Sequence, residues 1–390
     1  MKKKIFTLIL CLVTISSMLF NVSAQSKSRK KEYKFDFGSV SVEKGFVGVN
    51  STDKYTKEKG YGFNSPEYIK DVVAVGTEEN NDAIRFLKFG VKSKNTFNVD
   101  LPNGLYEIEL TLGNTTRSSV AAEEVYQVMN MTGNNCYDKF QIPITDGQLN
   151  ILVTEGKAGA IFTLSSIKIK KISNIPITKK TIYLCGDSTT CNYYPLETTN
   201  QAGWGQMFFK YIKPEKYNIK NMATGGQIAR GFKNDGQFES IMKYIKPGDV
   251  YMLDLGINDV NAKHNEPVGE FKEHMRDMIV QTKSKGALVI LVTPHGRSID
   301  FNENGIHYAE EKWYRNATIE LSQEENVSLI DMNVLSSKYF TSIGPTATLD
   351  LFKDNVHFNR DGATKIAEII AKDMKDKKLL GRSSYTNLLY

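Results

Sequence analysis

The sequence predicts an all-β sandwich followed by an α/β domain with a parallel, doubly wound sheet. Two observations indicate this order. Over residues 33–172, apolar and polar side chains alternate with a period of two, and turn residues separate the runs. From residue 180 onward, apolar runs end in Gly-containing turns and alternate with helix-like stretches, which is typical of a parallel sheet covered on both faces.

The first 24 residues have the pattern of a secretory signal peptide. Three lysines are followed by a largely apolar stretch, residues 5–20, and Val22-Ser23-Ala24 favours cleavage after Ala24. The apolar stretch is short for a membrane span. We therefore expect an exported protein, secreted or periplasmic, with no membrane insertion.

The sandwich is expected over residues 33–172. Alternation is clearest over residues 97–101 and 106–112, and the turn at residues 102–104 between them predicts a β-hairpin. Residues 173–179 contain a proline and no hydrophobic pattern, so we expect a linker there.

The α/β domain is expected over residues 180–380. Its predicted strands are the apolar runs 181–185, 217–221, 250–255, 287–292 and 327–330. Its predicted helices include one whose buried face carries Phe271, Met275, Met278 and Ile279, one over residues 308–324, and a last one over residues 363–374.

Charge and cysteine content exclude several classes of protein. The formal net charge is +6, and without Lys2, Lys3 and Lys4 of the signal it is +3, too weak to favour nucleic acid. Loss of Cys11 with the signal leaves Cys136, Cys185 and Cys191, an odd number with no zinc-site spacing. A bridge between Cys185 and Cys191 stays open, although the strand position of Cys185 favours a buried thiol. We expect no metal and no cofactor.

Polar clusters follow the predicted strands, where ligands gather in open parallel sheets. The clusters are Gly186-Asp187-Ser188, residues 223–230, Gly256-Ile257-Asn258-Asp259, residues 293–297 and Asp354-Asn355-Val356-His357. In this order they resemble the SGNH/GDSL hydrolase superfamily, from Lys180 to about Asp376. The resemblance implies a three-layer, flavodoxin-like hydrolase fold.

The resemblance also assigns roles. Ser188 would be the nucleophile, His357 the general base and Asp354 the residue that orients the imidazole. The oxyanion hole would be formed by the backbone N–H groups of Ser188 and Gly226 and the side-chain amide of Asn258. The choice of Gly226 over its neighbour rests on its distance from the Ala-Arg pair that follows.

Other residues near these clusters have open roles. His295 follows a predicted strand, and Tyr193 and Tyr194 follow the Ser188 turn, so each is a candidate for substrate contact. Trp204 could stack on a sugar, but burial in the core is the simpler interpretation. We expect Asp259 to support its turn rather than react.

Within the superfamily, residues 186–189, 225–230, 292–294, 327–331 and 357–359 are similar to rhamnogalacturonan acetylesterases, and residues 33–38 resemble a galactose-binding-like sandwich. The resemblance implies an esterase that removes O-acetyl groups from an acetylated pectic polysaccharide. The alternatives are acetylated xylan or a lipid ester as substrate, or an inert glycan-binding protein. Whether the sandwich binds glycan or braces the catalytic domain stays open, as does the oligomeric state.

Overall fold

The computed structural model describes residues 32–73, 82–87, 95–154, 163–308 and 312–386. The expected signal peptide, residues 1–24, lies outside these residues, so its cleavage stays a prediction. Across the described ranges, no helix is both long enough and apolar enough to span a bilayer.

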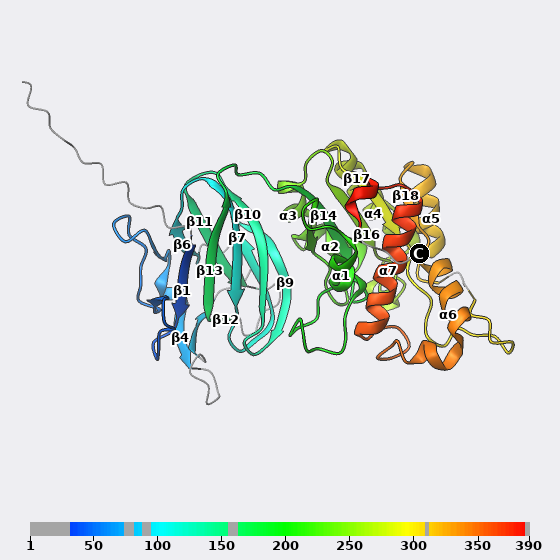
Figure 1. Cartoon of the computed structure of the whole chain (residues 1–390), viewed down its shortest axis with the longest axis horizontal. Coiled ribbons are helices and arrows are strands. Elements are labelled where there is room, and N and C mark those ends of the chain that lie inside the picture. Colours follow the sequence, from blue (N-terminus) through cyan, green and yellow to red (C-terminus); the bar gives the residue numbers. More distant parts are fainter. Residues whose placement is uncertain (1–31, 74–81, 88–94, 155–162, 309–311, 387–390) are drawn as a thin grey trace, which may run out of the picture. The chain divides into compact units, whose positions relative to one another are not determined.

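The first half of the described chain is a β-sandwich, as predicted (Figure 1). Its elements are β1 (Glu32–Phe37), β2 (Val47–Val49), β3 (Tyr61–Phe63), η1 (Pro66–Tyr68), β4 (Ile69–Val73), β5 (Asp82–Phe86), β6 (Phe97–Asp100), β7 (Gly104–Thr111), β8 (Thr115–Ala122), β9 (Val125–Gly133), β10 (Tyr137–Ile144), β11 (Gln148–Thr154), β12 (Thr163–Leu164) and β13 (Ser166–Ser173). In the described residues they form sheets of order β10-β7-β13-β1-β2, β3-β6-β11-β8-β9 and β12-β5-β4.

The two larger sheets pack face to face through aromatic side chains. Phe37 on β1 meets Phe97 on β6 edge to face, with ring centroids 4.8 Å apart, and Phe63 on β3 packs against both. All three rings are fully buried. Edge-to-face pairs add to the burial of apolar area, so this cluster joins the sheets.

The predicted hairpin is wrong. Strands β6 and β7 are consecutive, but β6 pairs with β3 and β11, whereas β7 pairs with β10 and β13 in the other sheet. The turn at residues 102–104 therefore crosses between sheets. Alternation shows that one face of each strand is buried. The same alternation is expected whether two consecutive strands pair in a hairpin or lie in two sheets that pack face to face.

The second half is the predicted α/β domain. Its strands are β14 (Lys180–Gly186), β15 (Tyr217–Asn221), β16 (Val250–Asp254), β17 (Leu288–Val292) and β18 (Ser328–Ile330). Its helices are α1 (Trp204–Met207), η2 (Phe208–Tyr211), α2 (Ala229–Asn234), α3 (Gln237–Tyr244), η3 (Ala262–His264), α4 (Val268–Ser284), α5 (Arg315–Glu324), α6 (Met332–Leu349), α7 (Arg360–Asp376) and η4 (Arg382–Ser384). The sheet order is β15-β14-β16-β17-β18, and every neighbouring pair is parallel.

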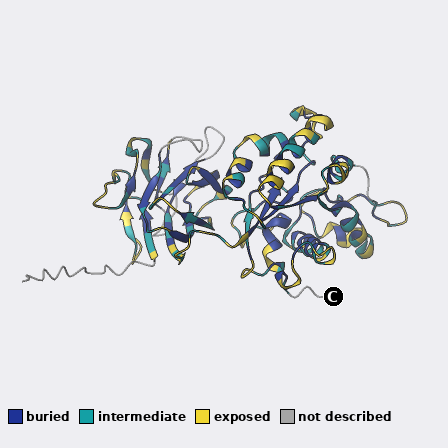
Figure 2. Ribbon diagram, turned by 90° about the horizontal axis from the view of Figure 1, so that it is seen from above, coloured by how far each residue is buried: buried dark blue, intermediate teal, exposed yellow. Residues whose placement is uncertain are grey.

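Both faces of this sheet are covered, as a doubly wound fold requires. On β14, Ile182 and Leu184 belong to a core with α7, whereas Tyr183 and Cys185 belong to a core with α4. Successive side chains of one strand point to opposite faces, so the two cores lie on opposite sides of the sheet. Figure 2 shows buried residues concentrated in the strands of this half and exposed residues along its helices.

Helix boundaries depart from the sequence prediction at two places. The helix expected from residue 308 begins at Arg315, because Trp313 and Tyr314 both have a φ of 56°, outside the helical region. Helix α6 was not predicted. Its start carries a signal, since the Asp331 side chain accepts a hydrogen bond from the N–H of Val334 as an N-cap. The buried face predicted for α4 is confirmed.

Candidate active site

The turn that carries Ser188 begins where β14 ends. A Cβ on Gly186 would lie 2.6 Å from the carbonyl oxygen of Asp254 on the adjacent strand, so only glycine fits without displacement. The Asp187 carbonyl then accepts the N–H groups of Thr190 and Cys191 at 3.2 and 3.0 Å. These bonds close a tight turn and leave the Ser188 side chain at the carboxyl edge of the sheet.

Ser188, His357 and Asp354 are brought together as the sequence predicts. The Ser188 Oγ lies 2.9 Å from His357 Nε2, and His357 Nδ1 lies 2.8 Å from Asp354 Oδ2. Asp354 Oδ1 accepts the N–H groups of Val356 and His357, both at 2.7 Å. With an ionised Asp354, the Nδ1 position carries the imidazole proton, which leaves Nε2 to accept the serine proton.

The Asp354 carboxylate is exposed, with 57% of its side chain accessible. Burial acts to raise its pKa, but the hydrogen bonds from the two backbone N–H groups and from His357 lower the pKa overall. The ionised form needed to hold the imidazole is therefore stabilised by the short turn that connects the two residues.

The segment that carries Gly226 lies beside Ser188. A Cβ on Gly225 would be 4.0 Å from Ser188 Cβ, and Gly226 has a left-handed φ of 77°. Within the described parts of the chain, the N–H groups of Ser188 and Gly226 donate to no other group. Asn258 Nδ2 donates to the Gln227 carbonyl at 3.1 Å, which orients the amide.

Two buried carboxylates hold the segment that carries Gly226. Asp259 accepts the N–H of Ala229 at 2.7 Å through one oxygen and the N–H of Gly256 at 2.9 Å through the other. It thus joins the start of α2 to the loop after β16. Burial, and the nearby charge of Glu266, raise the pKa of Asp259 to about 7. Asp259 supports its turn, as expected.

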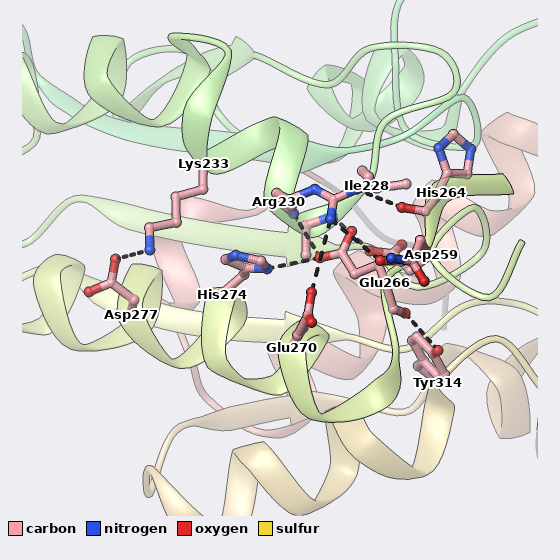
Figure 3. Close-up of polar contacts among 12 residues, drawn as sticks. Ile228, Arg230, Lys233, Asp259, His264, Glu266, Glu270, His274, Asp277 and Tyr314 are labelled. Carbon is pink, nitrogen blue, oxygen red and sulfur yellow. Dashed lines mark hydrogen bonds and ion pairs between the residues drawn. The ribbon is translucent and has the colours of Figure 1, made fainter. Parts of the chain in front are cut away.

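Glu266 is the second of these carboxylates and lies beside the first turn of α2 (Figure 3). Its Oε1 accepts the N–H of Arg230 at 3.0 Å and lies 2.9 Å from His274 Nδ1. The Arg230 guanidinium donates to the carbonyl of His264 at 2.6 Å. Carboxylates satisfy free N–H groups at a helix start and interact favourably with the helix dipole. Asp259 and Glu266 together fix the chain just after Gly226.

A second pair of carboxylates, Asp187 and Asp254, lies beneath the nucleophile turn. Asp187 accepts the N–H of Thr189, and its other oxygen is 3.4 Å from Asn258 Nδ2. Asp254 accepts Trp204 Nε1 at 2.8 Å and the Thr190 hydroxyl at 2.9 Å. Burial raises the pKa of both carboxyls. For Asp187, the charge of Asp254 adds to this rise. Trp204 is core, as expected.

The three residues considered for substrate contact differ in their surroundings. The Tyr193 hydroxyl donates to the Ser188 carbonyl at 2.9 Å, and the Tyr194 hydroxyl donates to Asp138 at 2.6 Å. His295 is buried, packs against the Phe358 ring and holds the Gly296 carbonyl through Nδ1. Burial lowers the pKa of His295 to about 4, so its ring is neutral. Substrate contact by these residues stays a prediction.

Sequence reasoning missed Asp254 and Glu266. Asp254 ends an otherwise apolar strand, and an aspartate inside such a run is itself a signal of a buried, bonded carboxylate. Glu266 lies in a polar loop and carries no comparable signal. Cys136, Cys185 and Cys191 are free and buried. In the described residues, no three His, Cys, Asp or Glu side chains form a metal-binding group.

Both halves of the chain match known families. Residues 33–170 match the "Beta-agarase/YXIM esterase-like, galactose-binding domain-like" family, and residues 182–370 match the "GDSL-like Lipase/Acylhydrolase" family. The "Uncharacterized esterase YxiM" of Bacillus subtilis is 59% identical over 353 residues, which cover 90% of this chain and 92% of that protein. Its crystal structure matches with a TM-score of 0.88 over 90% of this chain and 100% of that chain.

Shorter relatives match half of this chain. The "Probable rhamnogalacturonan acetylesterase YesY" of Bacillus subtilis is 33% identical over 205 residues, 50% of this chain and 92% of that protein. The "Rhamnogalacturonan acetylesterase RhgT" of the same organism is 28% identical over 210 residues, 50% of this chain and 89% of that protein.

Proposed function

This chain belongs to the GDSL-like lipase/acylhydrolase family and carries an N-terminal galactose-binding-like domain, and from this we propose that it is a carbohydrate esterase. Its substrate is an acetylated pectic polysaccharide of the rhamnogalacturonan type, from which it releases acetate. The observation that carries the proposal is the arrangement of Ser188, His357 and Asp354, whose two contacts are 2.9 and 2.8 Å.

In the proposed reaction, Ser188 Oγ attacks the acetyl carbonyl while His357 Nε2 takes the serine proton. The tetrahedral intermediate collapses to an acetyl-enzyme, and His357 returns its proton to the departing sugar oxygen. A water molecule, deprotonated by His357, then attacks the acetyl group, and acetate leaves as Ser188 regains its proton. Asp354 keeps the imidazole oriented throughout and stabilises its charged form.

The negative charge that develops on the acetyl oxygen requires donors that are in place before the reaction. The proposal assigns this role to the N–H groups of Ser188 and Gly226 and to Asn258 Nδ2. The bonds of Asp259 and Glu266 to the start of α2 support it, because they hold the Gly226 segment without using the N–H of Gly226 itself.

The choice of pectic substrate is supported by sequence features around the site. Residues 225–230 and 357–359 are similar to the corresponding segments of rhamnogalacturonan acetylesterases, and two relatives that match the hydrolase half carry that name. The proposal includes export, supported by the signal-like residues 1–24, because a polymeric substrate lies outside the cell.

The test measures acetate released from acetylated rhamnogalacturonan and acetylated xylan, and fatty acid released from a long-chain lipid ester, by the purified protein. We expect acetate from the first substrate, and no acetate from Ser188→Ala, which removes the nucleophile. Ser284→Ala, an exposed serine at the end of α4, is the matched control and should match the unmodified protein.

The outcomes separate the alternatives. Acetate release by Ser188→Ala would overturn the catalytic assignment. Faster release from acetylated xylan or the lipid ester would replace the substrate but keep the mechanism. Absence of all ester hydrolysis, with glycan binding retained, would favour an inert binding protein.

A further inference from the structure

The loop after the nucleophile turn is held by a carboxylate of the β-sandwich. Asp138 lies on β10, and its Oδ2 accepts the Tyr194 hydroxyl at 2.6 Å and the Asn192 amide at 3.4 Å. Its Oδ1 accepts the N–H of Lys139 at 2.7 Å, which fixes the orientation of the carboxylate. The two residues that it holds lie four and six positions after Ser188.

Asn221 extends this contact to the turn itself. Its Nδ2 donates to Asn192 Oδ1 at 2.9 Å and to the Thr190 carbonyl at 2.8 Å. Its Oδ1 accepts the N–H of Ala223 at 3.1 Å, at the start of the segment that leads to Gly226. One continuous set of hydrogen bonds therefore joins the sandwich to the backbone on both sides of the proposed oxyanion hole.

Asp138 is half-buried, which distinguishes it from another polar contact between this loop and the sandwich. Tyr137, its neighbour on β10, donates to Glu197, but both of these side chains are exposed. Burial raises the pKa of Asp138, and the donors Tyr194, Lys139 N–H and Asn192 counteract this rise. Loss of one of these donors would leave the desolvation of the carboxylate less well offset. Asp138 therefore favours the loop conformation in which Tyr194 and Asn192 both reach it.

We propose that Asp138 is a positioning residue for ester hydrolysis, which acts through Tyr194, Asn192 and Asn221 to fix the turn that carries Ser188. The proposal rests on the proposed role of Ser188 as nucleophile. It makes the sandwich part of the catalytic unit, in addition to any contact that it makes with glycan.

The test uses the full-length protein and a small chromogenic acetate, which is too small to need a glycan-binding domain. Asp138→Ala should lower kcat roughly 10-fold and leave KM within about twofold, because the turn is misplaced while binding of the acetyl group persists. Tyr194→Phe removes one hydroxyl and should lower kcat about threefold. Asp138→Asn keeps an oxygen that can accept the Tyr194 hydroxyl, so this variant should retain most of the kcat of the unmodified protein.

Coupling separates positioning from general destabilisation. Because Asp138 and Tyr194 act along one path, the double variant should lose little more kcat than Asp138→Ala alone. Glu109→Gln is the matched control. Glu109 lies on β7, opposite Lys139 of β10, and its ion pair with Lys168 joins two residues of the sandwich and no residue of the loop. It should leave kcat unchanged.

Two results would overturn the proposal. One is unchanged kcat in both Asp138→Ala and Tyr194→Phe, and the other is losses that simply multiply in the double variant. Neither result touches the proposed function, which fails only if the unmodified protein cleaves no ester or Ser188→Ala keeps its activity.

Discussion

The two flanks of Ser188 are built in opposite ways. On one flank, Asp354 and His357 come from a single turn, and 57% and 32% of their side chains are accessible. On the other, Asn258 and Gly226 come from distant segments that Asp259 and Glu266 hold from the interior, with exposed fractions of 1% and 3%.

The difference follows from what each flank must fix. For His357, only the orientation of the imidazole ring must be fixed. Asp354, three residues earlier in the same turn, fixes it through a local hydrogen bond. The oxyanion donors are backbone and amide groups on separate loops, so their positions depend on bonds between those loops. Buried carboxylates suit this task, because each can accept two or more N–H groups in surroundings where water does not compete.

The largest effect is expected on the buried flank. Asn258→Ala removes a proposed oxyanion donor and should lower kcat about 100- to 1,000-fold with little change in KM. Steady-state kinetics on a small chromogenic acetate measure it. Asn261→Ala, in the same loop, removes only a cap to the N–H of Lys263 and serves as control. A loss below about fivefold for Asn258→Ala would remove Asn258 from the oxyanion hole.

A smaller effect is expected on the exposed flank. Asp354→Asn keeps an acceptor for the two backbone N–H groups but loses the charge that holds His357 Nδ1–H. Loss of a buried triad aspartate costs about 10,000-fold. Water screens the exposed Asp354, so we expect about 100-fold. The exposed Asp350→Asn is the control. If Asp354→Asn were the more damaging of the two substitutions, the contrast between the flanks would be wrong.

The same contrast explains what the sequence could predict. Asp354 and His357 lie three residues apart, and Gly-Asp-Ser and Gly-x-Asn-Asp follow apolar runs, so spacing and strand ends brought the proposed site residues together. The fold class followed from two periodicities. The bonds of Glu266 to Arg230 and of Asp138 to Tyr194 join positions 36 and 56 residues apart, and no local pattern encodes such pairs.

The misplaced hairpin has a related cause. Alternation over β6 and β7 reports burial of one face, which both a hairpin and two facing sheets satisfy. The choice between them depends on the partners β10 and β13, which are distant in sequence. Helix α6 was missed because Gly344 and Pro345 interrupt its hydrophobic pattern, and the chain is non-helical at Gly344, where φ is 81°.

The smallest expected effect concerns the stability that Asp254, the buried carboxylate beneath the Ser188 turn, contributes. Burial raises the pKa of Asp254 above its ordinary value of 3.8, so the folded state binds its proton more tightly than the unfolded state does. The resulting stabilisation is complete below the unfolded pKa and is lost as pH rises through the folded pKa. Asp254→Asn keeps an acceptor for Trp204 and Thr190 but cannot ionise.

From pH 4.5 to pH 8, the free energy of unfolding of Asp254→Asn should therefore gain about 1 kcal/mol or more relative to the unmodified protein. Melting temperatures across this range measure the change. Asp249→Asn is the contrasting control, because Asp249 is buried but paired with Lys246 and bonded to the N–H of Thr181, so its loss should destabilise the fold. Parallel pH profiles for Asp254→Asn and the unmodified protein would show that folding does not raise the pKa of Asp254. The exposed Asp354 and the buried Asp254 would then differ in their hydrogen-bond geometry but not in how burial affects their ionisation.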